Sequence, residues 1–148
     1  MLSDHFSLDE FTASQTATRN GIKNTPSETV VENLRMLAAL LEQVRELLGG
    51  GAIHISSGYR SLALNRHIGS SDSSAHVRGY AADFTCPAFG TPIEVAKKIA
   101  ESNLKFDQLI YESGANPWVH ISCDPQNRRQ LLTARFEHGH TYYTTGIT

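Results

Sequence analysis

Three residues in two separate segments carry side chains that could bind a catalytic metal ion. His76 and Asp83 lie seven residues apart, and His120 follows later, in the run Trp118-Val119-His120. Two imidazoles and a carboxylate can fill three positions of a catalytic zinc site, in which the fourth position stays open for water. The sequence therefore predicts that His76, Asp83 and His120 bind one Zn²⁺.

Small residues around Asp83 strengthen this prediction. A single histidine is weak evidence for a metal site, so the argument depends on the arrangement. Gly79 lies between the two ligands of the first segment and allows a backbone conformation or a close approach that a side chain would forbid. Ala81 and Ala82 leave space beside the carboxylate.

Capping residues and apolar periodicity predict four helices. A capping box from Ser7 to Glu10 opens a short helix, and the polar stretch 12–25 after it predicts a loop. The run 26–28 starts the longest helix, whose apolar residues recur at three- and four-residue intervals until the glycines at 49–51. Two shorter helices are expected at 62–65 and from Thr91 to about Ser102.

The predicted strands carry two of the three ligands. Strands are expected at 52–56, 80–84, 106–111 and 118–122, followed by a hairpin of 134–137 and 141–143 around His138-Gly139-His140. His76 would then lie at the end of the serine-rich loop 69–74. Because helices come first and strands dominate later, we predict an α+β fold with an antiparallel sheet and flanking helices.

Length and composition predict one globular domain. The chain has 148 residues, of which 40% are hydrophobic and 19% charged, so we expect a single domain with a helical part at 1–50 and a catalytic part at 51–148. The formal net charge of -2 and the lack of a dense Lys/Arg run argue against a nucleic-acid partner, and Arg128-Arg129 is expected to cap or face solvent. We expect a monomer.

Neither a membrane segment nor a signal peptide is predicted. No window approaches the roughly twenty apolar residues of a membrane span. The first residues have neither a basic nor an apolar region, so we expect synthesis in the cytoplasm and export by another route. The only cysteines, Cys86 and Cys123, are expected to be buried thiols, with a disulfide between them left open.

The ligand segments resemble the signature of the zinc D-alanyl-D-alanine carboxypeptidase family. The resemblance covers about 57–122 and rests on Ser57-Gly58-Tyr59-Arg60-Ser61, Ser74-x-His76-x-x-Gly79-x-Ala81-x-Asp83 and Trp118-Val119-His120. That family includes D,D-carboxypeptidases, D,D-dipeptidases of vancomycin resistance and L-alanyl-D-glutamate endopeptidases used as phage endolysins. The N-terminal helices, with Asn24-Thr25-Pro26, resemble its phage and prophage branch.

The resemblance implies a fold, an activity and further site residues. The fold would be of the hedgehog/D,D-peptidase type, with Zn²⁺ on His76, Asp83 and His120. Arg60 would correspond to the family arginine that faces the substrate carbonyl or carboxylate, and a guanidinium there can stabilise an oxyanion. The substrate would be a peptidoglycan stem peptide, cut at D-Ala-D-Ala or at L-Ala-D-Glu by a phage or prophage lysin that a holin releases or a virion carries.

The general base departs from the family pattern. Endolysin and dipeptidase members have a glutamate three residues before the last ligand, where this chain has Pro117. We predict that Glu112, at the start of the polar loop before Trp118, takes the proton from the attacking water and returns it to the leaving amine. Alternatively, Glu112 only caps the loop, and the base is one of three residues of the final hairpin, namely Glu137, His138 or His140.

Three further residues are candidates for substrate binding. Ser74 is expected to hydrogen-bond a ligand or the substrate. Tyr59 and Trp118 are expected to contact the substrate or to belong to the core or the pocket wall. His54 alternates with apolar neighbours, which places it on the solvent side of its strand.

A second function stays open because of Pro117. A chain of this fold that lacks a base could be a zinc-stabilised cell-wall-binding or phage structural module with weak or no catalysis. A hedgehog-like signalling domain is disfavoured by the small size and the absent signal sequence. Fold kinship by itself does not decide among these functions.

Overall fold

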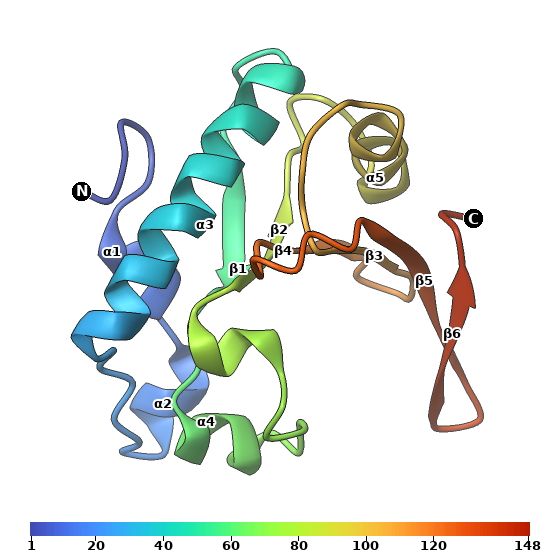
Figure 1. Ribbon diagram of the computed structural model, residues 1–148. Helices are drawn as coiled ribbons and strands as arrows, with labels where there is room; N and C mark the ends of the chain where they lie inside the picture. The colour runs from blue at the N-terminus through green and yellow to red at the C-terminus, as the bar shows by residue number, and fades with distance from the viewer.

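One sheet of six strands forms the centre of the computed structural model, which describes all 148 residues (Figure 1). The strands, in the spatial order β1-β2-β4-β3-β5-β6, are β1 (His54–Ser57), β2 (Ala81–Thr85), β3 (Gln108–Glu112), β4 (Trp118–Ser122), β5 (Gln130–Glu137) and β6 (His140–Thr145). The helices are α1 (Leu8–Thr12), α2 (Gln15–Arg19), α3 (Glu28–Leu47), α4 (Leu62–His67), α5 (Pro92–Ala100) and the 3-10 helix η1 (Ala75–Arg78). The predicted α+β class is confirmed.

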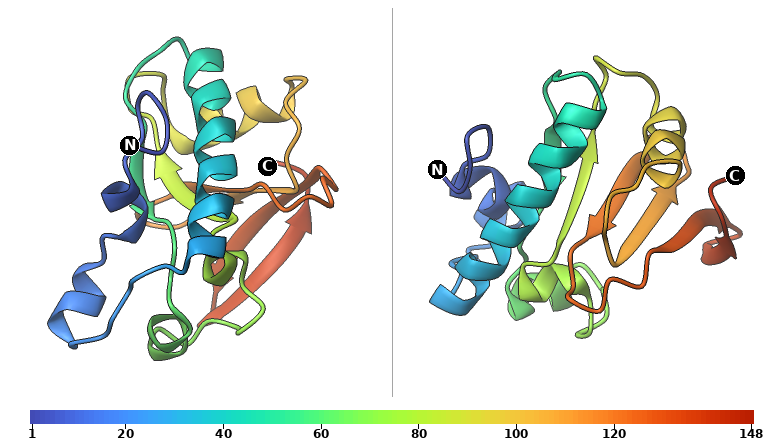
Figure 2. Two further views of the ribbon diagram at one scale, coloured as in Figure 1. Left: turned by 60° about the vertical axis from the view of Figure 1, so that its left-hand side comes forward. Right: turned by 45° about the horizontal axis from the view of Figure 1, so that its top comes forward.

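Helices α3 and α5 cover one face of the sheet (Figure 2). The core combines apolar residues of these two helices with alternate residues of β2, β4 and β3, namely Ala82, Phe84, Val119, Ile121 and Leu109. Side chains alternate along a strand, so the residues between them point to the other face. Asp83 and His120 are among those residues, and the metal-ligand face is therefore the one that α3 and α5 leave free.

One strand pair differs from the predicted antiparallel sheet. Four pairings are antiparallel, but β3 and β5 run parallel. The parallel pairing follows from the path of the loop 123–129. This loop starts at the end of β4, which lies on one side of β3, passes the start of β3 and continues into β5 on the other side. The sheet is thus mixed.

Asp107 fixes this crossover loop to the start of β3. Its carboxylate is buried and accepts hydrogen bonds from the backbone nitrogen of Arg128 at 3.1 Å and from the guanidinium of Arg128 at 2.9 Å. Arg129 donates from its guanidinium to the carbonyl of Ala100 at the end of α5, at 3.4 Å, and to that of Leu104 in the segment after the helix, at 3.0 Å. The expectation that this arginine pair caps is confirmed for Arg129.

Asp107→Asn is expected to lower the free energy of unfolding at pH 7 by about 1–3 kcal/mol, because it removes charged hydrogen bonds at a buried site. The hydrogen bonds from Arg128 lower the pKa of Asp107 below its ordinary value. Asp107 therefore stabilises the fold above the unfolded pKa of about 3.9, and this contribution disappears as the pH falls through the lower folded value. Denaturant unfolding of wild type and variant at pH 7 and pH 3 measures this.

The matched control for Asp107 is Asp124→Asn, because Asp124 lies in the same loop and its side chain accepts only from the backbone nitrogen of Gln126. Its effect should stay within about 0.5 kcal/mol. Equal losses for the two variants at pH 7, or a loss for Asp107→Asn that grows toward low pH, would contradict the assignment.

Three local predictions need correction. The polar stretch 12–25 contains helix α2, capped by Ser14, where a loop was predicted. His76 lies within η1 and not at the end of a loop. The turn of the last hairpin consists of His138 and Gly139, both with positive φ, and His140 already belongs to β6.

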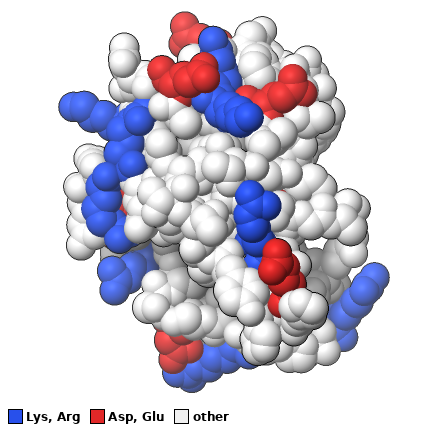
Figure 3. Space-filling view, turned by 90° about the vertical axis from the view of Figure 1, so that its right-hand side faces the viewer, with Lys and Arg blue, Asp and Glu red and all other residues white.

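The surface agrees with the composition. On the face drawn in Figure 3, Lys and Arg follow one another along the left edge, and elsewhere they lie beside Asp and Glu. No helix combines the length and the apolar character needed to cross a membrane. Both cysteines are free thiols, as predicted, but only Cys86 is buried, and Cys123 is half-buried.

Candidate functional site

The sheet register brings Asp83 and His120 together. The two residues are directly opposite each other in the antiparallel pair β2–β4, so their side chains share the face opposite the core. Nδ1 of His120 lies 3.0 Å from Oδ1 of Asp83. Two residues that are 37 positions apart in the sequence are thus in contact across neighbouring strands.

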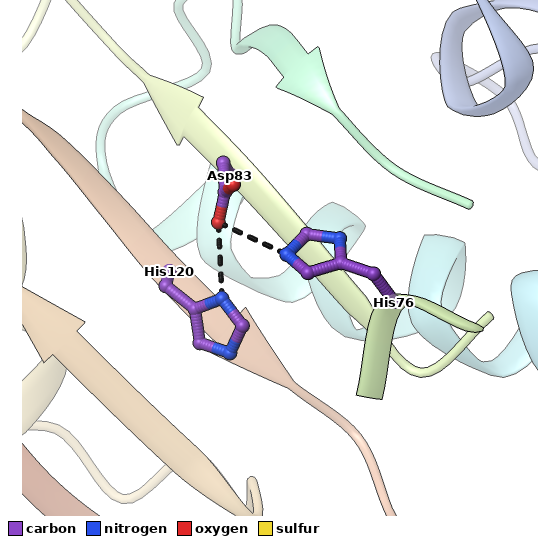
Figure 4. A group of neighbouring side chains, drawn as sticks. All are labelled: His76, Asp83 and His120. Carbon is purple, nitrogen blue, oxygen red and sulfur yellow. Dashed lines mark hydrogen bonds and ion pairs between the residues drawn. The ribbon is translucent and has the colours of Figure 1, made fainter. Parts of the chain in front are cut away.

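His76 reaches the same carboxylate from η1 (Figure 4). Its Nε2 lies 3.3 Å from Oδ1 of Asp83, and its side chain is only 3% exposed. Its Nδ1 lies 2.7 Å from the carbonyl oxygen of Gly58. Because a carbonyl only accepts, Nδ1 carries the hydrogen, and the lone pair of Nε2 is directed toward the cluster.

These distances and charges fit a metal site. The donor atoms of His76, Asp83 and His120 all lie within 4.8 Å of one another. Two ligand atoms at about 2.0–2.1 Å from a tetrahedral zinc ion lie about 3.4 Å apart. The separations of the two histidine nitrogens from Oδ1 of Asp83, 3.3 and 3.0 Å, are close to this value. Two imidazoles with a carboxylate suit zinc, and the group could therefore hold such an ion.

The protonation states of His76 and Asp83 are those that a metal requires. Burial lowers the pKa of His76, and the charge of Asp83 offsets this decrease only in part. Burial raises the pKa of Asp83, but the two histidines outweigh it and hold that pKa well below its usual range. The site thus presents an ionised carboxylate and, at His76, a neutral imidazole, the forms that bind metals.

Gly79 ends η1 at a point where a side chain cannot fit. Its φ is +77°, and an added Cβ would lie 2.9 Å from Cγ1 of Val30 and 3.1 Å from the Val30 carbonyl oxygen. The chain therefore passes directly against α3 between the ligand on η1 and the ligand on β2. The predicted close approach at Gly79 is confirmed.

Gly79→Ala is expected to lower the free energy of unfolding by about 2–4 kcal/mol, the sum of left-handed backbone strain and overpacking against Val30. Gly69→Ala is the matched control, because Gly69 has a φ of +80° and no atom within 4 Å of an added Cβ. Strain alone should cost the control about 1 kcal/mol. Urea unfolding of both variants measures the difference, and equal losses would show that the contact with Val30 is unimportant.

An open groove of about 800 Å³ runs over the metal-ligand cluster. Asp83, Ile110, Glu112 and His120 form its floor, one wall comes from 68–74, and the opposite wall comes from the β5–β6 hairpin. Arg60, Ser74 and Trp118 also line it. The structure thus brings together most of the predicted site residues.

Tyr59 is the exception. It packs against the core and lines a neighbouring cavity that Arg60 shares with the groove. Its backbone is tightly held, because its nitrogen donates to the Phe11 carbonyl and its carbonyl accepts from Asn24. Burial raises the pKa of its hydroxyl.

Ser74 links Arg60 to His76. Its hydroxyl oxygen accepts from the backbone nitrogen of His76 at 3.3 Å and from Nη2 of Arg60 at 3.4 Å. Nε of Arg60 is buried without a hydrogen-bond partner, as is Nε1 of Trp118. Burial lowers the pKa of Arg60, and Asp83 counteracts this. Two buried donors at the groove are thus unpaired.

Glu112 lies on the ligand face as the last residue of β3. It is opposite Trp118, and two residues before it Ile110 is opposite His120. Burial raises the pKa of Glu112, His120 lowers it, and Asp83 raises it further. The carboxylate therefore lies within the electrostatic field of the ligand cluster.

The alternative bases are placed differently. Glu137, His138 and His140 are exposed at the tip of the β5–β6 hairpin, and none of them lines the groove. His54 is exposed at the start of β1, as predicted.

Sequence reasoning missed two parts of the site. Gly58 orients His76 through its carbonyl, and an added Cβ would lie 2.6 Å from the Phe11 carbonyl oxygen. The glycine of Ser-Gly-Tyr-Arg was the available signal. Phe136, Thr141 and Tyr143 line the groove from the hairpin, and no sequence signal indicated this, because it depends on the parallel β3–β5 pairing.

Comparison with known proteins assigns a family. The family model for Peptidase M15 matches residues 4–122, most of the chain. No curated protein matches the chain. The matched region contains His76, Asp83 and His120 with the elements that carry them, and it ends before β5. The group of His76, Asp83 and His120, which could hold a metal ion, agrees with this match. The chain therefore belongs to the peptidase M15 family of zinc peptidases.

Proposed function

We propose that the protein hydrolyses an amide bond in peptidoglycan stem peptides, with one zinc ion, as a phage or prophage lysin. The observation that carries this proposal is the position of the His76, Asp83 and His120 cluster on the floor of an open groove that also presents Arg60 and Glu112. A groove of this kind admits an extended peptide, and a metal beside a carboxylate and a guanidinium is suited to amide hydrolysis.

His76, Asp83 and His120 would hold the ion, and the Gly58 carbonyl would keep the His76 ring in place. When bound, zinc supplies Lewis acidity, which polarises a carbonyl and lowers the pKa of water to about 7. Glu112 accepts the proton of the attacking water and delivers it to the leaving amine.

The remaining residues position the substrate. The free guanidinium donors of Arg60 stabilise the oxygen of the scissile carbonyl as negative charge develops there, and Ser74 orients that guanidinium. Nε1 of Trp118 donates to a second substrate oxygen. Tyr59 can contact substrate only where its cavity joins the groove at Arg60.

Arg60→Ala is expected to lower kcat/KM for stem-peptide hydrolysis by about 10²–10³-fold, the usual cost of removing one oxyanion donor. Arg60→Lys should recover little, because an ammonium lacks the planar fork of donors. Steady-state kinetics, with bound metal measured alongside, tests this. Arg66→Ala is the matched control, since Arg66 is exposed on α4 and pairs with Asp72. Equal activity of Arg60→Ala and Arg66→Ala would refute the role.

A second function is a zinc-stabilised wall-binding module, which is favoured by Pro117 at the position of the family glutamate. Incubation of the zinc-loaded protein with purified peptidoglycan separates the two functions. A hydrolase generates new free amines and lowers the turbidity. A binding module sediments with the wall and generates none, and that result would refute the proposed hydrolase.

A further inference from the structure

The β5–β6 hairpin lies beyond the region of the family match, yet it forms a wall of the groove. Ala134 of β5 is opposite Glu112 on one side and Tyr143 on the other. Residues opposite each other share a face, so Glu112 and Tyr143 point to the same side of the sheet. Phe136 and Thr141, which are opposite each other, follow two residues further on that face.

One contact and one electrostatic effect place this wall beside Glu112. An added Cβ on Gly114, two residues after Glu112, would lie 3.6 Å from the Phe136 ring, so the ring packs on the loop that follows the carboxylate. Burial raises the pKa of the Tyr143 hydroxyl, and the charge of Glu112 raises it further. The hairpin is thus the wall of the groove on the Glu112 side.

The charges in the groove are distributed unevenly. Its three guanidiniums, Arg60, Arg78 and Arg128, come from the segment after β1, from η1 and from the crossover loop. Arg128 is bound to Asp107, which directly precedes the first residue of β3, whereas Glu112 is the last residue of that strand. The lining residues around Glu112 comprise Trp118, Phe136, Thr141 and Tyr143, and none of them is a cation.

From this we infer that the hairpin wall receives the leaving-group side of the substrate and selects a leaving residue whose carboxyl group is neutral, as an amide or as a continuing peptide bond. The inference rests on the proposed function, because a residue that protonates the leaving amine must lie within hydrogen-bond reach of it. A free carboxylate there would face Glu112 with no guanidinium or ammonium group among Trp118 and the hairpin residues that line the groove, and a partly desolvated charge without such a partner is costly. Phe136 and Tyr143 instead offer aromatic surface to a neutral group.

The test uses the synthetic stem peptide L-Ala-γ-D-Glu-L-Lys-D-Ala-D-Ala with the carboxyl groups of D-Glu and the last D-Ala either free or amidated. Mass spectrometry of the products identifies the bond that is cut. We expect kcat/KM to be at least about tenfold higher for the amidated peptide, since like charges placed side by side are strongly disfavoured. Equal rates, or preference for the free carboxylates, would overturn the inference and leave the proposed function intact. Cleavage of neither peptide would refute the proposed function itself.

A pair of charge variants tests the wall directly. Thr141→Arg supplies a cation on the groove side of β6, and we expect it to reduce the preference for the amidated peptide about tenfold. Thr144→Arg adds the same charge on the same strand, but Thr144 is opposite the core-side Thr133 and does not line the groove. Its preference should equal that of wild type. If the two variants behave alike, the hairpin does not face the leaving group and the inference is wrong.

Discussion

Glu112→Gln is expected to lower kcat for stem-peptide hydrolysis by about 10³-fold, within the range for loss of a general base, while bound zinc is unchanged. The amide has nearly the same shape as the carboxylate but cannot accept the proton of water. Steady-state kinetics with metal analysis of the same sample measures both quantities. Glu137→Gln is the matched control, because Glu137 ends β5 at the exposed hairpin tip.

The pH dependence of the Glu112 variant gives a second readout. A general base works when it is ionised, and burial raises the pKa of Glu112. Wild-type kcat/KM should therefore fall as the pH is lowered through the ionisation of this carboxyl, and this acidic limb should be missing from the residual activity of Glu112→Gln. Near-wild-type hydrolysis by the zinc-bound variant would show that another group is the base.

His76→Ala is expected to lose nearly all bound zinc and, with it, all measurable hydrolysis. His76 is one of only three protein donors, and it is already oriented by the Gly58 carbonyl at 2.7 Å. Metal content after dialysis against a defined low zinc concentration measures the loss. Zinc should raise the Tm of the wild type and not of the variant, because a ligand stabilises the fold that binds it.

His54→Ala is the matched control for the ligand variant. His54 is exposed at the start of β1, away from the cluster, so this variant should keep wild-type metal content and activity. Full metal retention by His76→Ala would refute the ligand assignment.

The residues of the candidate metal site could be predicted from the sequence, but their contacts could not. The strands that carry Asp83 and His120 follow from local patterns of apolar residues, and β4 spans the predicted residues. That these two strands are neighbours, with the two residues opposite each other, depends on sheet order and register. Those are long-range properties that no single segment encodes.

Glu112 illustrates the same limit. The sequence places it at the start of a loop that would have to fold back over the metal. In the structure Glu112 is the last residue of β3, and the pairing with Trp118 sets its position. Glu112 was predicted as part of the site, whereas the strand pairing that places it there could not be predicted.

The other differences have physical causes as well. Helix α2 buries only Ala17, so it has no apolar periodicity that could reveal it. The parallel β3–β5 pair arises because a loop of seven residues crosses one strand, held by a buried carboxylate whose partners lie about twenty positions away. The groove wall on the hairpin depends on that crossover.

Mass spectrometry of muropeptides after digestion of purified peptidoglycan tests the central claim most directly. The account predicts that the zinc-loaded wild type creates new amino and carboxyl termini within the stem peptide. It predicts none with chelator-treated protein, and almost none with Glu112→Gln. Intact stem peptides after incubation with zinc-loaded protein that has bound the wall would contradict the account.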